Sequence, residues 1–111
     1  MAQPTEMPGA LAVAASAMAH YEEGNVISYT LLKRSGGAIT LFAFDEGQSL
    51  SEHTASFDAV AHVLEGEADI IIGGVPIPVA AGSIVLMPAK RPHAVHARTR
   101  VKMLVTTLRS A

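Results

Sequence analysis

Residues 47–66 have the sequence GQSLSEHTASFDAVAHVLEG, and residues 82–97 have the sequence GSIVLMPAKRPHAVHA. In each stretch a glycine marks a tight turn, an apolar segment favours a β-strand, and a histidine lies near an end of the strand. Gly47 is followed by five residues and then His53, and the second stretch contains His93. Two histidines placed alike on separate strands can face one another across a small barrel, which is how a β-protein builds a metal site.

Around these stretches the chain alternates short β-branched segments with turn signals. Gly73-Gly74 is typical of a tight hairpin turn. Pro76 and Pro78 favour a sheet edge, because proline donates no ladder hydrogen bond. Eight or more short strands, with turns every eight to twelve residues or so, predict an all-β sandwich or barrel rather than a βαβ fold. The expected strands are 26–32, 38–44, 59–64, 67–72, 75–79, 83–87, 93–97 and 101–108.

Composition narrows the class of protein. The chain has 111 residues, the size of one domain, and 50% of them are apolar. It contains no cysteine, so any metal must be held by imidazole, carboxylate or water. The formal charge is −2, no long basic run is present and aromatics are 5%, so no nucleic-acid partner is expected. The low charged fraction of 16% favours a homo-oligomer.

The N-terminal part differs from the rest. Residues 1–9 predict a loose arm, and the alanine-rich segment Leu11–His20 predicts a short helix. The apolar run Gly9–Ala19 is preceded by Glu6 and by no Lys or Arg, and it is too short to span a bilayer. We therefore expect neither a signal peptide nor a membrane helix, but a cytoplasmic protein without a membrane partner. The expected division is an arm with a short helix, 1–25, and a β-barrel domain, 26–111.

Two spacing patterns carry a family resemblance. The pattern G-x5-H-x-H-x(3,4)-E-x6-G is occupied here by Gly47, His53, Ala55, Ala59 and Gly66. The pattern G-x5-P-x-G-x2-H-x3-N is occupied here by Gly82, Pro88, Lys90, His93 and Ala97. In both patterns the chain resembles a small single-domain cupin, over about residues 26–108. The resemblance implies a double-stranded β-helix, the cupin jelly-roll barrel, with a short N-terminal helix.

The resemblance also implies a site. Metal-binding cupins use two histidines and a carboxylate from the first pattern and the histidine of the second. Here His53 and His93 are kept, whereas Ala55 and Ala59 replace the second histidine and the acid. The implied site is a reduced one for a divalent metal (Fe, Mn, Ni or Zn), and family enzymes are dioxygenases, isomerases or decarboxylases. A homodimer is implied as well, with the opening strands 26–32 and 38–44 as its interface or, alternatively, as inner core.

Two residues near the missing acid are further candidates. His62 is the best third ligand if a β-bulge turns it inward. In a regular strand His62 and Ala59 face opposite sides, and the imidazole points outward or lines a pocket. Asp58 is either a ligand or general base, or a turn residue that accepts hydrogen bonds from backbone amides.

Substrate-binding candidates lie beside these positions. They are Asp58, Phe57, which would cap the barrel mouth, Met87, which would line the core or a cavity, and Lys90. Lys90 and Arg91 would form a cationic rim for an anionic substrate, or else serve only solubility.

Two functions follow from these residues. The first is a small-molecule-binding cupin with a metal at His53, His93 and the third candidate His62. A site of two or three imidazoles without a carboxylate is dipositive, which favours an anionic molecule. The second is a metal-free binding or sensor module whose barrel holds an apolar ligand, because Ala55 and Ala59 enlarge the cavity and remove charge. The sequence does not decide between catalysis and binding.

Overall fold

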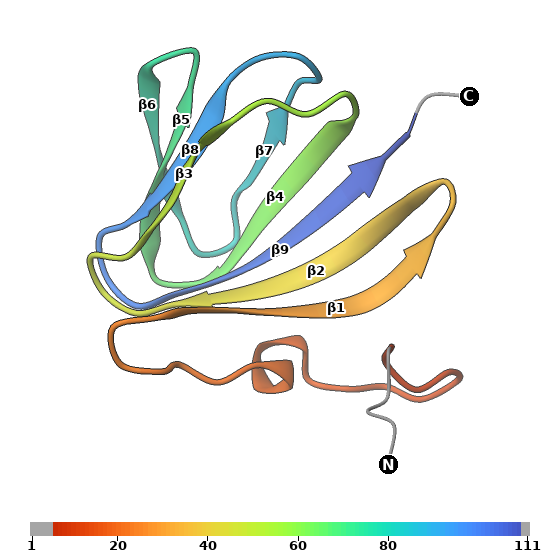
Figure 1. Cartoon of the computed structure of the whole chain (residues 1–111). Coiled ribbons are helices and arrows are strands. Elements are labelled where there is room, and N and C mark those ends of the chain that lie inside the picture. Colours follow the sequence, from red (N-terminus) through yellow and green to blue (C-terminus); the bar gives the residue numbers. More distant parts are fainter. Residues whose placement is uncertain (1–5, 110–111) are drawn as a thin grey trace.

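The computed structural model describes residues 6–109, and these form two antiparallel β-sheets packed face to face (Figure 1). The five-stranded sheet has the order β1-β2-β9-β4-β7, and the four-stranded sheet has the order β3-β8-β5-β6. The strands are β1 (Val26–Arg34), β2 (Gly37–Phe44), β3 (Ser49–His53), β4 (Asp58–Glu65), β5 (Glu67–Ile72), β6 (Val75–Ala80), β7 (Ile84–Met87), β8 (His93–Ala97) and β9 (Val101–Leu108).

Alternation along the strands builds the core between the sheets. In β4 the side chains of Ala59, Ala61 and Val63 are buried, while the intervening residues are only partly covered. In β5 Ile70 and Ile72 are buried in the same way. Every second side chain of these strands therefore points between the sheets, where it packs against side chains of the other sheet. This confirms the all-β jelly roll expected from the sequence.

All eight expected strands are present, with ends within two residues of the expected ranges. The strand β3, which ends at His53, adds a ninth among residues 6–109. The strand with Pro76 and Pro78 is β6, which lies at a sheet edge as predicted.

The N-terminal helix is much shorter than Leu11–His20. A single 3-10 turn, η1 (Ala15–Met18), is present, and no side chain caps it at Ala14. The helix propensity of alanine contributes little free energy in so short a segment, and the packing of the segment on the sheet determines its conformation instead. The chain instead runs along the outer face of the five-stranded sheet, where Met18, Ala19 and Tyr21 join an apolar cluster (Figure 1). The expected ranges 1–25 and 26–111 extend past the described residues at both ends, although β1 does begin at Val26.

The opening strands are covered unevenly, β2 on both faces and β1 mainly at Leu31. Leu41 and Ala43 of β2 and Leu31 of β1 are buried in the outer cluster with Ala19. Phe44 of β2 is buried in the core between the sheets. β2 is therefore largely in the packed interior, whereas β1 is a sheet edge on which only Leu31 is buried. No helix within residues 6–109 has the length and apolar character that a membrane crossing needs.

Candidate functional site

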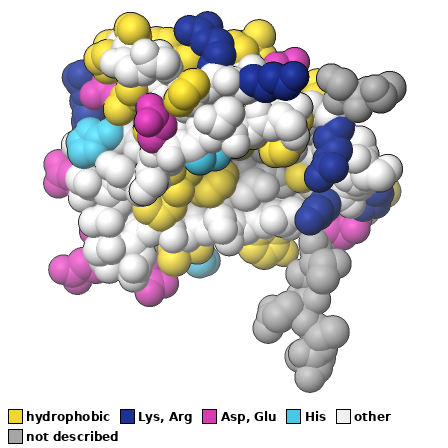
Figure 2. All heavy atoms as spheres, turned by 45° about the horizontal axis from the view of Figure 1, so that its top comes forward, with side chains coloured by type: hydrophobic (Ala, Val, Ile, Leu, Met, Phe, Trp, Pro, Cys, Tyr) yellow, Lys and Arg dark blue, Asp and Glu magenta, His cyan; other side chains and the backbone are white. Residues whose placement is uncertain are grey.

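A cavity of about 340 Å³ lies between the two sheets. Figure 2 shows the face on which hydrophobic side chains and a histidine are exposed in a hollow. The cavity wall is apolar apart from two histidines and two threonines. Its apolar side chains larger than alanine are Phe42, Leu50, Phe57, Met87, Val95, Met103 and Val105. A volume of this size suits a small organic molecule.

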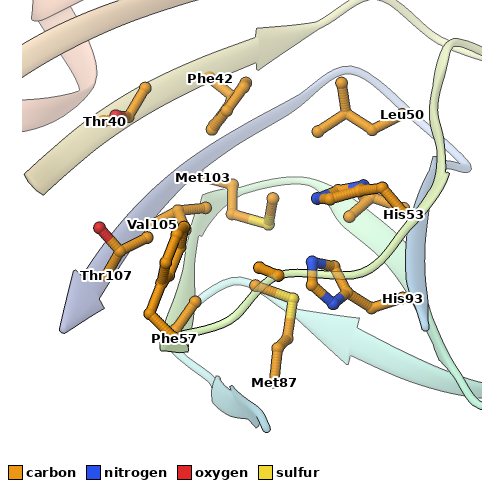
Figure 3. Close-up of a pocket in the computed structure, with 13 residues that line it drawn as sticks. Thr40, Phe42, Leu50, His53, Phe57, Met87, His93, Met103, Val105 and Thr107 are labelled. Carbon is orange, nitrogen blue, oxygen red and sulfur yellow. The ribbon is translucent and has the colours of Figure 1, made fainter. Parts of the chain in front are cut away.

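His53 and His93 are brought together in this cavity, as the sequence predicted. They come from neighbouring strands: His53 of β3 is the ladder partner of His93 of β8. The ring centroids are 4.3 Å apart, with an angle of 69° between the planes, so one ring meets the other edge to face (Figure 3). The histidines thus lie side by side on one sheet, and do not reach each other across the barrel as expected.

The backbone sets the proton position on both rings. Nδ1 of His53 lies 3.0 Å from the carbonyl oxygen of Ser51, and Nδ1 of His93 lies 3.2 Å from that of Arg91. Because a carbonyl oxygen only accepts, each Nδ1 must donate, and each neutral ring then has an unprotonated Nε2. Neither Nε2 has a hydrogen-bond partner within residues 6–109. Two acceptor nitrogens are therefore available at the cavity, one on the buried His93 and one on the exposed His53.

Ala55 and Ala59 line the same cavity. They occupy the positions at which the cupin pattern has a histidine and an acid, so their methyl groups leave space where two polar side chains would stand. Throughout residues 6–109, no group of three or more His, Cys, Asp or Glu side chains is placed to hold a metal ion.

His62 does not reach the cavity. Its strand pairs with β7 and β9 in regular register from Asp58 to Val63. His62 therefore shares the outer face of the sheet with its ladder partners Ile84 and Leu104, opposite to Ala59. The bulge that would turn it inward is absent at this position, so its role as third ligand has no geometric support.

Asp58 also lies outside the cavity wall. Its Oδ1 accepts a hydrogen bond of 2.8 Å from the backbone N–H of Ala89. This bond joins Asp58 to the loop between β7 and β8, 31 residues away, so it is not the bond to local backbone amides expected of a turn aspartate. Lys90, in that loop, donates its backbone N–H to the carbonyl of Ala55 at 2.7 Å. Lys90 thus adjoins a lining residue without lining the cavity itself.

Phe57 and Met87 line the cavity as predicted, and several further lining residues were not singled out from the sequence. Figure 3 shows Thr40 and Thr107 on the side of the cavity away from the histidines. Strand alternation could have found them, since they share a face with Phe42 and Val105 two positions along their strands.

The donor set does not fit a resident metal of the usual kind. Catalytic zinc sites have three protein ligands and structural sites four. The cavity supplies two imidazoles, and the alanines remove the other two positions. The two adjacent Nε2 atoms can accept hydrogen bonds from a small molecule, or can take up a proton from it.

The sequence matches the family model for the cupin domain over residues 40–107. No curated protein matched the chain. Among solved structures, a conserved protein of unknown function from Streptococcus pyogenes is 30% identical, with a TM-score of 0.90, and the match covers 100% of this chain and 97% of that one.

A cupin superfamily protein from Desulfitobacterium hafniense is 28% identical, with a TM-score of 0.89 over 98% of this chain and 100% of that one. A protein described as a predicted oxalate decarboxylase from Thermotoga maritima is 18% identical, with a TM-score of 0.74 over 78% of this chain and 83% of that one, which shows the common fold alone. The family match covers more than half of the chain and agrees with both glycine patterns. The protein belongs to the cupin family.

Proposed function

We propose that this cupin binds a small, largely apolar molecule without a resident metal, and that the molecule donates a hydrogen bond to His53 and His93. The observation that carries the proposal is the state of the two rings. Backbone carbonyls hold both Nδ1 protons, which leaves two Nε2 acceptors in a cavity of about 340 Å³ with apolar walls.

The favoured ligand has a hydroxyl or N–H group on an apolar body. An unpaired acceptor in an apolar site weakens the binding of a purely apolar ligand, because the acceptor loses water and gains no partner. It strengthens the binding of a ligand that donates a hydrogen bond to it. The aromatic and thioether side chains of Phe42, Phe57, Met87 and Met103 suit an aryl or branched alkyl group. A phenol, which joins a hydroxyl donor to an aromatic ring, is therefore a suitable test compound for this class of ligand.

The test compares 4-ethylphenol with ethylbenzene by isothermal titration calorimetry. We expect the wild-type protein to bind the phenol about tenfold more tightly, which is the scale of one net hydrogen bond. The double variant His53→Leu/His93→Leu, which keeps apolar volume, should still bind ethylbenzene and lose the preference. Wild-type protein that binds neither compound at millimolar concentration, or that binds both equally, contradicts the proposal.

A metal-dependent cupin is the second candidate, and one observation favours it. Metal-ligating histidines commonly donate the other ring N–H to a backbone carbonyl, as both rings do here. His53 and His93 would then be two ligands of Fe, Mn, Ni or Zn, which would act as a Lewis acid. Metal analysis of the same wild-type and double-variant proteins separates the candidates. Stoichiometric metal that the variant lacks would replace the metal-free proposal with this one.

A further inference from the structure

Two exposed cationic residues, Lys90 and Arg109, adjoin residues of the cavity wall and have no ion-pair partner among residues 6–109. Arg34, Arg98, Arg100 and Lys102 pair with carboxylates, whereas Lys33, Lys90, Arg91 and Arg109 form no ion pair within residues 6–109. Figure 2 shows Lys and Arg side chains along the margin of the hollowed face. Lys90 and Arg109 border the same part of the wall, the segment from Ala55 to Phe57.

Arg109 is positioned by its backbone and by an aromatic ring. It directly follows β9, and its N–H donates to the carbonyl of Gly36 at 2.9 Å. Its guanidinium carbon lies 5.9 Å from the ring centroid of Phe57, which lines the cavity. Contact with the ring face favours a cation and holds the guanidinium near the mouth.

Lys90 is held in an unfavourable backbone conformation. Its φ is +67°, in the left-handed region that side chains other than Asn and Asp rarely adopt. The cupin pattern has glycine at this position, which adopts such a φ without strain. The bond from the Lys90 N–H to the carbonyl of Ala55 fixes the residue next to the cavity. The surrounding loop therefore holds a lysine in a conformation that glycine would adopt without strain.

Asp58 forms no ion pair with Lys90 or Arg109 within residues 6–109. Asp58 directs Oδ1 to the backbone N–H of Ala89, so that oxygen is engaged within the loop. The histidines occupy the other side of the cavity from Phe57 and Thr107 (Figure 3). The cavity thus has hydrogen-bond acceptors at one side and the Arg109 guanidinium against Phe57 at the other. Lys90 is bonded to Ala55, which lies between His53 and Phe57 in the chain.

We infer that the ligand is an amphipathic monoanion, with a carboxylate as its head group. The carboxylate pairs with Lys90 and Arg109, the apolar body fills the cavity, and a hydroxyl or N–H at the far end donates to the histidines. This inference rests on the proposed function, because it adds the charged end to the same ligand. Lys90 and Arg109 are then the residues that select for charge.

The test uses three compounds with one phenol body and different head groups: 3-(4-hydroxyphenyl)propanoate, its primary amide, and tyramine. Calorimetry should give affinities in the order carboxylate, amide, amine, with the carboxylate about tenfold above the amide, as for one charge-assisted hydrogen bond. In Lys90→Gly/Arg109→Gln this preference should fall to less than about twofold, with amide binding unchanged. Lys90→Gly folds readily because glycine accepts the φ of +67°.

The matched control is Arg98→Gln. It removes one positive charge from the outer face of the four-stranded sheet, where Arg98 pairs with Asp69 of β5. It should leave the preference for the carboxylate over the amide intact. Equal binding of carboxylate and amide by the wild type overturns the inference but leaves the proposed function standing. A preference that survives Lys90→Gly/Arg109→Gln and disappears in His53→Leu/His93→Leu also overturns it, by placing the anion at the histidines. Failure of all three compounds to bind counts against the proposed function itself.

Discussion

Gly66 and Gly47 adopt the same backbone conformation in different surroundings. Both have a φ of +82°. A Cβ atom on Gly66 would stand 1.9 Å from the carbonyl oxygen of Arg100, whereas a Cβ on Gly47 would meet no atom within 4 Å. The first cupin pattern therefore begins with a glycine needed for its torsion and ends with one needed for torsion and space.

We predict that Gly66→Ala is far more destabilising than Gly47→Ala. The left-handed torsion costs alanine about 1–2 kcal/mol at either position. At Gly66 the chain must also shift to relieve a backbone clash, which brings the expected loss to about 3–4 kcal/mol. Urea unfolding of the two variants measures the difference, with Gly47→Ala as the matched control. Equal losses would show that the contact with Arg100 is easily relieved.

The residues that the sequence placed correctly are those fixed by spacing. His53 and His93 follow from the glycine patterns, and Phe57 and Met87 lie close to them in the chain. His62 depended on whether its strand bulges, which is decided by cross-strand pairing and not by local sequence. A register shift does occur in β4, but between Val63 and Glu65, just beyond the position that would have turned His62 inward.

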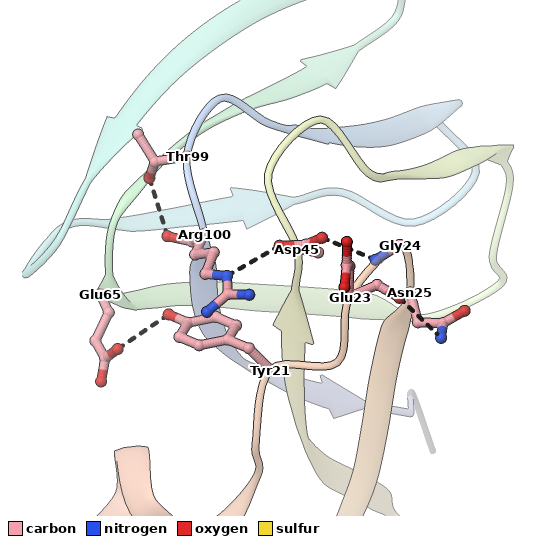
Figure 4. Close-up of polar contacts among 8 residues, drawn as sticks. All are labelled: Tyr21, Glu23, Gly24, Asn25, Asp45, Glu65, Thr99 and Arg100. Carbon is pink, nitrogen blue, oxygen red and sulfur yellow. Dashed lines mark hydrogen bonds and ion pairs between the residues drawn. The ribbon is translucent and has the colours of Figure 1, made fainter.

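At the scale of elements, the N-terminal arm is the part that the sequence described least well. Its residues are held by side chains distant in the chain, which no local pattern reveals. The Tyr21 hydroxyl donates to Glu65 at 2.9 Å, and burial together with this carboxylate raises the pKa of Tyr21 (Figure 4). Arg100 and Lys102 lie over the Tyr21 ring, at 5.2 and 4.9 Å from its centroid.

The same network anchors the turn into β1. Asp45 accepts a hydrogen bond from the backbone N–H of Gly24 at 2.8 Å and pairs with Arg100 at 2.9 Å (Figure 4). The Gly24 N–H, and secondly the Arg100 guanidinium, lower the pKa of Asp45. Alanine content does not reveal these long-range contacts. It therefore predicted a regular helix in a segment that in fact follows the surface of the sheet.

We predict that Lys102→Met releases the arm and leaves the barrel intact. Lys102 is only 9% exposed, and its Nζ donates to the carbonyl of Ser16 in the 3-10 turn. Methionine keeps the apolar stem but leaves that carbonyl without its donor, at a cost of about 1–2 kcal/mol. Amide hydrogen exchange in residues 14–21 should become about tenfold faster, while β4 and β9 keep their protection. Lys33→Met, at an exposed residue of β1, is the control and should change neither. Uniform acceleration across the barrel would mean that arm and barrel unfold as one unit.

At the scale of the whole molecule, the arm covers one part of the five-stranded sheet and leaves another part bare. Leu86, Val60 and Thr106 are neighbours across β7, β4 and β9, and so are Ile84, His62 and Leu104. Leu104 packs against the cluster beneath the arm and so marks the border of the bare part. Ile84 is 66% exposed and Leu86 57%. Because β7 is also an unpaired edge strand, both its face and its edge are open to association.

We propose that a second copy of the chain covers this face, so that the homodimer expected from the sequence forms through β7 and β4 and not through the opening strands. Leu31, Leu41 and Ala43 of the opening strands are already buried in the cluster with the arm, whereas β7 presents two large aliphatic side chains to solvent. Sedimentation velocity should show a dimer for the wild-type protein and a monomer for Leu86→Glu, since a charge buried in an apolar interface is strongly unfavourable. Val75→Glu is the matched control: Val75 is 62% exposed on β6 of the other sheet, and its substitution should leave the dimer intact. A wild-type monomer at micromolar concentration, or a dimer that persists in Leu86→Glu, would exclude this face as the interface.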